Sequence, residues 1–248
     1  MRMLETRDYR LSLERGRAAL TRKDRPSVFS MCGREWELLP EVFAPIYTPA
    51  TRIALEFLGL DEWVGVPRSG SMLEMGCGTG IIAVTSALAG CDRVVAADIH
   101  PAAALNASVN AARHGVLDRV RGVHSDLFDG IDENERFDTI FWHSNFVLAP
   151  ADYRPRSLHE IAYVDPGYAA HRRFLAEATD RLTPGGSVLL HFSTRGDVAA
   201  LLRIAGEAGR RLRVLKSAVR REGTQRVEHL LIEVTPAEVP VRRAAAVR

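Results

Sequence analysis

The chain has few cysteines and no long apolar run, and both shortages restrict the class of protein. Its three cysteines, Cys32, Cys77 and Cys91, have neither the spacing of a zinc site nor that of a disulfide framework. We therefore expect three free thiols in a reducing compartment and no metal. The longest stretch without charge, between Glu74 and Asp92, is interrupted by glycines and is short for a membrane helix.

Charge of one sign is also not in excess. The 33 Lys and Arg residues nearly balance 31 Asp and Glu residues, so the net charge of +2 gives no strong field for a nucleic-acid backbone. The N-terminus carries Arg2, Glu5 and Arg7 where a secretory signal would need apolar residues. These features predict a cytoplasmic protein with no membrane association and no strong nucleic-acid signal.

What the chain does have is an alternation of short β-type runs and helical stretches from about Glu56 onward, which predicts an α/β fold with a parallel sheet. The candidate strands are Ser71 to Met75, Arg93 to Ala97, Val120 to His124, Asp138 to His143 and Gly186 to Phe192. Two further runs, 212–219 and 227–234, are joined by too short a stretch for a helical crossover, so we expect an antiparallel hairpin.

The sequence also indicates how the chain is divided. We expect residues 56–236 to form one domain, because 248 residues are too few for two large cores. Residues 1–55 mix a charged helical segment with β-type residues and prolines, which suggests a cap or lid. Residues 237–248 have little apolar content and predict a flexible tail.

A glycine-rich turn follows the first strand and leads directly into the next helix. It reads Glu74-Met75-Gly76-Cys77-Gly78-Thr79-Gly80. We expect a side chain at any of the three glycines to collide with a ligand, since backbone must approach the ligand closely at such turns.

Two acidic residues follow later strands at matching places. Asp98 ends the second strand, about 20 residues beyond the glycines, where an acid meets ribose hydroxyls in Rossmann-like sites. Asp126 lies just past the third strand, where a carboxylate can accept from an adenine amine. Each feature alone can be a tight turn, a helix cap or a surface acid, but the ordered set favours a nucleoside-containing cofactor.

The spacing argues against a nicotinamide cofactor. It is Gly-x-Gly-x-Gly rather than Gly-x-Gly-x-x-Gly, and Glu74 precedes the turn. A carboxylate there would repel a pyrophosphate, but it suits the ammonium group of S-adenosylmethionine.

In these residues the chain resembles the class I S-adenosylmethionine-dependent methyltransferases over about residues 56–234. The resemblance implies a Rossmann-like seven-stranded sheet with an antiparallel C-terminal hairpin, and S-adenosyl-L-methionine as the cofactor. The residues that we expect at the cofactor are Glu74, Gly76, Cys77, Gly78, Thr79, Gly80, Asp98, Ile99, Asp126, Leu127 and His143.

The end of the fourth strand departs from the pattern of a related group. Methyltransferases of amide and amine nitrogens, which modify protein glutamine or ribosomal RNA bases, have Asn-Pro-Pro-Tyr or Asn-Pro-Pro-Phe here. This chain has His143-Ser144-Asn145-Phe146, so only the aromatic residue is kept. The resemblance implies shared ancestry and leaves the substrate open.

Three of these residues are the candidates for catalysis. His143 can act as a general base, since an unperturbed histidine has a pKa of about 6.5, or it can simply be hydrogen-bonded to backbone. Asn145 can orient the substrate or satisfy the loop backbone, and Phe146 can pack on the substrate, whereas Trp142 belongs to the core.

The substrate is expected to contact two further segments. Tyr47 lies in the cap and Tyr163 lies in an insertion at 149–166, although polar loop residues are often only solvated. We therefore predict an enzyme that N-methylates a small polar metabolite. The alternatives are a methyltransferase of protein glutamine or RNA and a non-catalytic cofactor-binding protein, and homodimer formation stays open.

Overall fold

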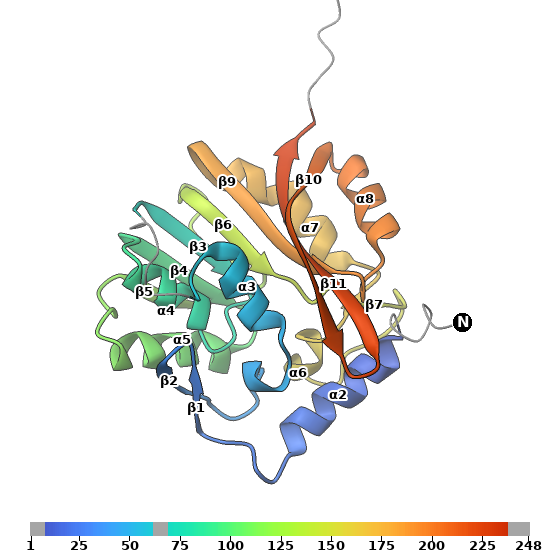
Figure 1. The fold of residues 1–248 in the computed structure, drawn as a ribbon. Helices are drawn as coiled ribbons and strands as arrows, with labels where there is room; N and C mark the ends of the chain where they lie inside the picture. The colour runs from blue at the N-terminus through green and yellow to red at the C-terminus, as the bar shows by residue number, and fades with distance from the viewer. Residues whose placement is uncertain (1–7, 62–68, 238–248) are drawn as a thin grey trace, which may run out of the picture.

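A seven-stranded sheet in the order β10-β11-β9-β6-β3-β4-β5 forms the centre of the molecule (Figure 1). The computed structural model describes residues 8–61 and 69–237. The strands of the sheet are β3 (Ser71–Met75), β4 (Arg93–Asp98), β5 (Val120–His124), β6 (Phe137–His143), β9 (Leu182–Ser193), β10 (Arg210–Glu222) and β11 (Gln225–Pro236). β11 runs antiparallel to both of its neighbours and the other pairs are parallel. The predicted α/β sheet and its C-terminal hairpin are confirmed.

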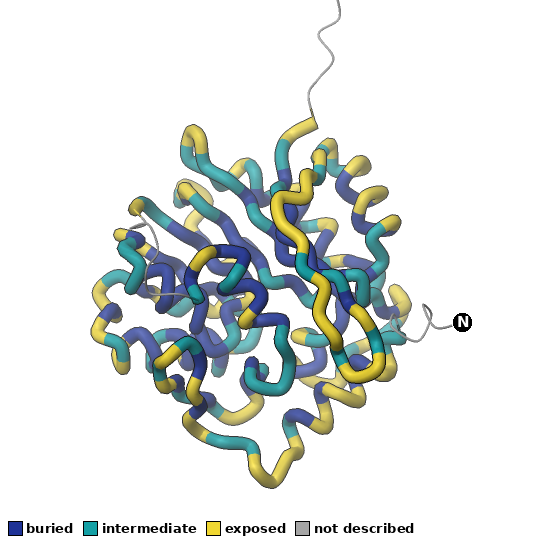
Figure 2. The backbone as a smooth tube through the Cα atoms, viewed as in Figure 1, coloured by how far each residue is buried: buried dark blue, intermediate teal, exposed yellow. Residues whose placement is uncertain are grey.

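Helices cover both faces of the sheet because its central strands are apolar on both sides. Val94 and Ala96 pack into one hydrophobic cluster, while Val95 and Ala97 pack into the other. One face is covered by α3 (Ala50–Leu58), α4 (Ile81–Leu88) and α5 (Pro101–Arg113), and the other by α7 (Ala169–Glu177) and α8 (Val198–Glu207). Figure 2 shows buried residues along the central strands, whereas the edge strand β10 is mostly exposed.

The N-terminal segment packs into the core rather than forming a separate body. It contains α2 (Tyr9–Thr21), the β1 (Val28–Met31) and β2 (Arg34–Glu37) hairpin and the short helix η1 (Pro45–Tyr47). Asn110 of α5 accepts a hydrogen bond from the Glu37 amide at 2.7 Å, and Trp36 is fully buried. α3 spans the expected boundary between residues 55 and 56, so cap and domain share this helix. The expected tail, apart from Ala237, lies outside the described residues.

The insertion after β6 contains its own small elements. They are β7 (Leu148–Ala149), α6 (Leu158–Ile161) and β8 (Asp165–Pro166), and the short helix η2 (Ala178–Arg181) follows α7. Asp165 binds the start of α7, since its carboxylate accepts from the His171 amide and ring at 3.0 and 2.6 Å. α6 lies beside α2 (Figure 1). Within the described ranges, no helix has the length and apolar character needed to cross a membrane.

Candidate active site

A cavity lies where β3, β4 and β6 end, which is the edge of a parallel sheet at which such folds bind ligands. The glycine-rich turn, Asp98 and the segment that follows β6 all line this cavity. Further walls come from α2, the stretch before α3, the segment after β5, the insertion at 149–166 and Arg195.

The three glycines of the turn serve different purposes. Gly76, Gly78 and Gly80 have φ angles of +64°, +55° and +74°, a region that favours glycine. A Cβ atom at Gly78 would meet no atom of residues 8–61 and 69–237 within 4 Å, apart from its chain neighbours, and would project from a residue that lines the cavity. A Cβ atom at Gly80 would instead lie 2.5 Å from Cα of Ala107.

The expectation that every glycine makes room for a ligand is therefore wrong for Gly80. Gly80 is absent from the cavity lining, and its missing side chain lets α4 and α5 pack closely. Gly76 and Gly78 do line the cavity, together with Cys77 and Thr79.

Asp98 connects the second strand to the glycine-rich turn. Its two carboxylate oxygens accept hydrogen bonds from the amides of Gly78 at 2.9 Å and His100 at 2.8 Å. Burial raises the pKa of Asp98, and these two hydrogen bonds act in the opposite direction. Because each carboxylate oxygen has a second lone pair, Asp98 can hold the turn and still accept from ribose hydroxyls.

Glu74 is a buried acid at the bottom of the cavity. It is 2% exposed, and its carboxylate accepts from the Ala83 amide at the first turn of α4 at 2.7 Å. Burial raises the pKa of Glu74 well above its ordinary value, and nearby Asp98 raises it further. Within residues 8–61 and 69–237, none of the ion pairs involves Glu74. A positively charged group that entered the cavity beside Glu74 would lower this pKa and favour the carboxylate form.

The expected adenine side of the site is more open. Asp126 lines the cavity with its side chain 50% exposed, and it pairs with Arg173 of α7 at 2.9 Å. Leu127, with a φ of +51°, and Ile99 line the cavity next to it. The structure therefore brings the expected cofactor residues together, with Gly80 as the exception.

The segment after β6 forms the other end of the cavity, where His143, Asn145, Phe146 and Tyr163 all contribute to the lining. The amide nitrogen of Asn145 donates to the carbonyls of Ile161 at 2.8 Å and Val164 at 3.0 Å. This fixes the amide orientation, because both partners are acceptors. Oδ1 of Asn145 is buried and has no hydrogen-bond partner in the described part of the chain.

His143 differs from its expected chemistry. Its ring stacks on His191 with centroids 4.5 Å apart. Burial, followed by the influence of His229, lowers the pKa of His143 to about 3. The expectation of a base with a pKa near 6.5 is therefore wrong, because the site disfavours the imidazolium. His143 is instead a neutral ring that can accept a hydrogen bond.

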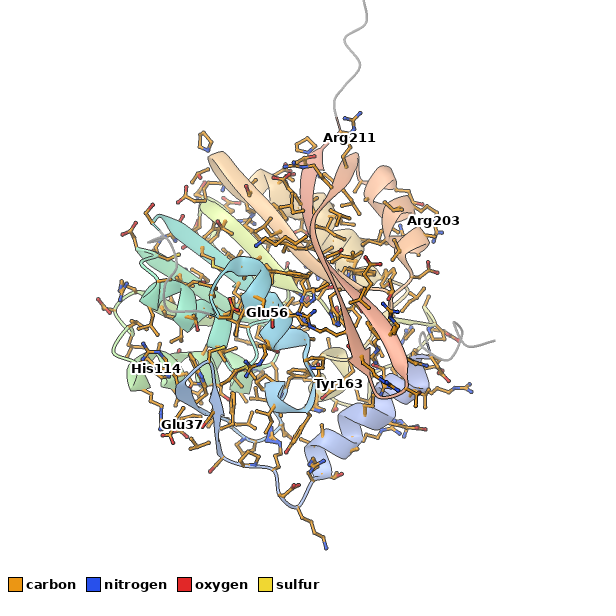
Figure 3. The ribbon with its side chains drawn as sticks, viewed as in Figure 1. Glu37, Glu56, His114, Tyr163, Arg203 and Arg211 are labelled. Atoms are coloured by element: carbon orange, nitrogen blue, oxygen red, sulfur yellow. The ribbon has the colours of Figure 1, made fainter. Side chains whose placement is uncertain are left out.

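The two expected substrate tyrosines separate in the structure. Tyr163, labelled in Figure 3, lies two residues beyond the end of α6 and lines the cavity, and burial raises its pKa to about 12. Tyr47 does not line this cavity, so the expectation for it is wrong. The η1 turn directs Pro45 and Thr48 toward the cavity and places the Tyr47 ring 4.9 Å from the guanidinium of Arg22.

Several residues of the lining are not predicted from the sequence. Arg195, which follows the end of β9, could have been found from its position, because strand ends at this edge of a sheet carry functional side chains. Ser12 of α2 and Phe43, which precedes η1, gave no comparable signal, because neither follows a strand of the sheet.

Comparison with known proteins agrees with this geometry. Residues 72–165 match the family model described as "Methyltransferase domain". A release factor glutamine methyltransferase from Bordetella pertussis is 32% identical over 196 residues, which is 73% of this chain and 70% of that protein. A ribosomal protein L11 methyltransferase from Desulforamulus reducens is 32% identical over 118 residues, and this chain covers only 36% of its length.

A solved structure shows the same fold. The 16S rRNA N2 G1207 methyltransferase of T. thermophilus, in complex with AdoMet and guanosine, has a TM-score of 0.58 at 22% identity. It covers 85% of this chain, which in turn covers 50% of that one. The chain belongs to the class I S-adenosylmethionine-dependent methyltransferases. It is thus a methyl-transferring enzyme, and S-adenosyl-L-methionine is its cofactor.

Proposed function

We propose that this enzyme methylates a nitrogen of a small polar acceptor enclosed in the cavity. The observation that carries this proposal is that α2 and the insertion at 149–166, together called the roof, line the same cavity as the cofactor turn. Such a cavity suits a molecule that can be surrounded on most sides.

The two parts of the roof are bound to each other by several hydrogen bonds. Nε2 of His159 in the insertion lies 3.2 Å from the carbonyl of Gly16 in α2, and its Nδ1 lies 2.8 Å from the carbonyl of Glu41, outside the roof. Ser12 donates to the carbonyl of Tyr163 at 3.0 Å, and Arg17 pairs with Glu160 at 3.1 Å. Because several bonds must break to move α2 from α6, access for a folded protein or an RNA helix is restricted.

The polar groups under the roof suit a nitrogen that carries hydrogens. Oδ1 of Asn145 has no hydrogen-bond partner among the described residues and can only accept, and the neutral ring of His143 can also accept. Two acceptors can hold an N–H group so that its lone pair points at the methyl carbon. S-adenosylmethionine, held by the glycine-rich turn and Asp98, would supply the methyl group. The nitrogen–carbon bond would form as the carbon–sulfur bond breaks, S-adenosylhomocysteine would be the leaving group, and the methylated nitrogen would lose its extra proton to water. Alignment of this kind contributes up to about 7 to 11 kcal/mol to a barrier reduction.

A second candidate is methylation of a glutamine side chain in a protein. The similarity to the B. pertussis release factor glutamine methyltransferase favours it. Two observations argue against it. The roof restricts access to the cavity, and His143-Ser144-Asn145-Phe146 replaces the Asn-Pro-Pro-Tyr motif.

Transfer of a labelled methyl group separates the two candidates. The enzyme would be incubated with labelled S-adenosylmethionine in three parallel reactions. One contains a panel of amino acids, amines and amides, the second contains release factor protein, and the third contains total RNA. We expect label in the small-molecule fraction and none in protein or RNA. Asp98→Ala, which removes the acceptor for the amides of Gly78 and His100, is the inactive control. Label that enters only protein or RNA would contradict the proposal.

A further inference from the structure

Arg195 is the positively charged side chain that lines the acceptor end of the cavity, within the described ranges. It lies two residues beyond the end of β9, and its side chain is 13% exposed. Its guanidinium is 5.9 Å from the ring centroid of Phe146, the aromatic residue next to Asn145. Arg195 therefore faces the part of the cavity where the acceptor is expected.

The charge of Arg195 is only partly balanced. Nη1 lies 3.4 Å from a carboxylate oxygen of Glu222, which is long for a charged hydrogen bond. The other Glu222 oxygen lies 3.0 Å from Nε2 of His229, so this acid is shared. Arg15 adds a second positive charge nearby, and burial lowers the pKa of Arg195.

The donors of Arg195 are also incompletely used. Nη2 contacts only the hydroxyl of Ser12, at 3.4 Å, and Nε is buried with no hydrogen-bond partner in the described residues. Buried donors without partners cost free energy, and an acceptor that enters the cavity would remove that cost. Nε and Nη2 form one edge of the guanidinium, which matches the two oxygens of a carboxylate.

We propose that Arg195 binds a carboxylate of the methyl acceptor, so that the acceptor is an anionic molecule with a nitrogen nucleophile. This inference rests on the proposed function and specifies its substrate class. One carboxylate suits the site because its two oxygens can accept from Nε and Nη2 of Arg195 at the same time. The nitrogen would lie toward Asn145 and His143, and the carboxylate toward Arg195 and Ser12.

Calorimetry with two matched probes tests this assignment. Succinamate has one amide and one carboxylate, and succinamide is its neutral diamide counterpart. With enzyme saturated with S-adenosylhomocysteine, we expect succinamate to bind about tenfold or more tightly than succinamide. Arg195→Gln should remove this preference, and Arg195→Lys should retain part of it because the charge stays but the paired donors are lost.

Controls keep the result interpretable. Arg203→Gln changes an exposed arginine on the outer side of α8 (Figure 3) and should keep the full preference. The double variant Arg195→Gln, Glu222→Gln avoids leaving the Glu222 carboxylate without its cation. The affinity of each variant for S-adenosylhomocysteine reports whether that variant is folded. Inorganic phosphate, as a third probe, should bind less tightly than succinamate.

Several results would overturn the assignment. They are equal binding of succinamate and succinamide, no measurable binding of succinamate, a preference that survives Arg195→Gln in folded protein, and phosphate binding tighter than succinamate. Because the titration involves no methyl transfer, the two proposals fail separately. A preference for succinamate together with label only in protein would overturn the proposed function and leave the Arg195 site in place.

Discussion

Gly78→Val should reduce the affinity for S-adenosylmethionine by about a hundredfold or more, while the sheet stays folded. A Cβ atom at Gly78 meets nothing within 4 Å in the part of the chain that the structure describes, and the residue lines the cavity. The valine side chain would therefore occupy the space that the cofactor needs. Calorimetric titration with S-adenosylhomocysteine measures the loss, and circular dichroism checks the fold.

Gly115→Val is the matched control for this substitution. Gly115 has a φ of +70°, a Cβ atom there also meets nothing within 4 Å, and the residue is not part of the cavity lining. Both variants carry similar backbone strain, but only Gly78→Val should lose cofactor binding. Near-native affinity in Gly78→Val would mean that the cofactor does not contact this turn.

His143→Leu should lower kcat by about 10- to 100-fold and leave the affinity for S-adenosylhomocysteine nearly unchanged. kcat should fall because the variant lacks a hydrogen bond to a nitrogen that becomes charged during transfer. A hydrogen bond of this kind is worth about 1.5 to 3 kcal/mol. His114→Leu is a suitable control, because His114 lies at the end of α5, away from Tyr163 and the cavity (Figure 3). Steady-state kinetics with an acceptor identified by label transfer gives both parameters. Unchanged kcat would show that His143 has only a packing role.

The pH profile adds a second readout for His143. Burial lowers its pKa to about 3, so the folded enzyme keeps this ring neutral until the pH falls to that value. His143 should therefore contribute no acid limb to kcat between about pH 5 and 8. An acid limb near pH 6.5 that disappears in His143→Leu would mean that the ring titrates normally and acts as a base.

The cofactor half of the site could be predicted from sequence because its residues follow strands at fixed places. The turn from Gly76 to Gly80, Asp98 and Asp126 all come after parallel strands, whose ends meet at one edge of the sheet. The family pattern therefore indicates the cofactor residues from short stretches of sequence. It does not say which glycine faces the ligand, because only the packed structure shows Ala107 against Gly80.

The acceptor half could be predicted only in part, because it is built by contacts between distant segments. Ser12 and Tyr163 are joined across 151 positions, and no local pattern indicates such a pairing. Tyr47 does not line the cavity as expected, because the backbone of the short η1 helix determines which of its residues face inward, and the sequence does not show this. The low pKa of His143 depends on its burial and on His229, which belongs to another strand.

A crystal structure of the complex with S-adenosylhomocysteine tests the central claim most directly, namely that cofactor and acceptor share the cavity under the roof. We predict that the ammonium group binds Glu74, the ribose binds Asp98, and the sulfur faces His143, Asn145 and Phe146 with α2 still against α6. A sulfur atom that faces open solvent, or a roof that has moved away to leave a broad groove, would contradict the account.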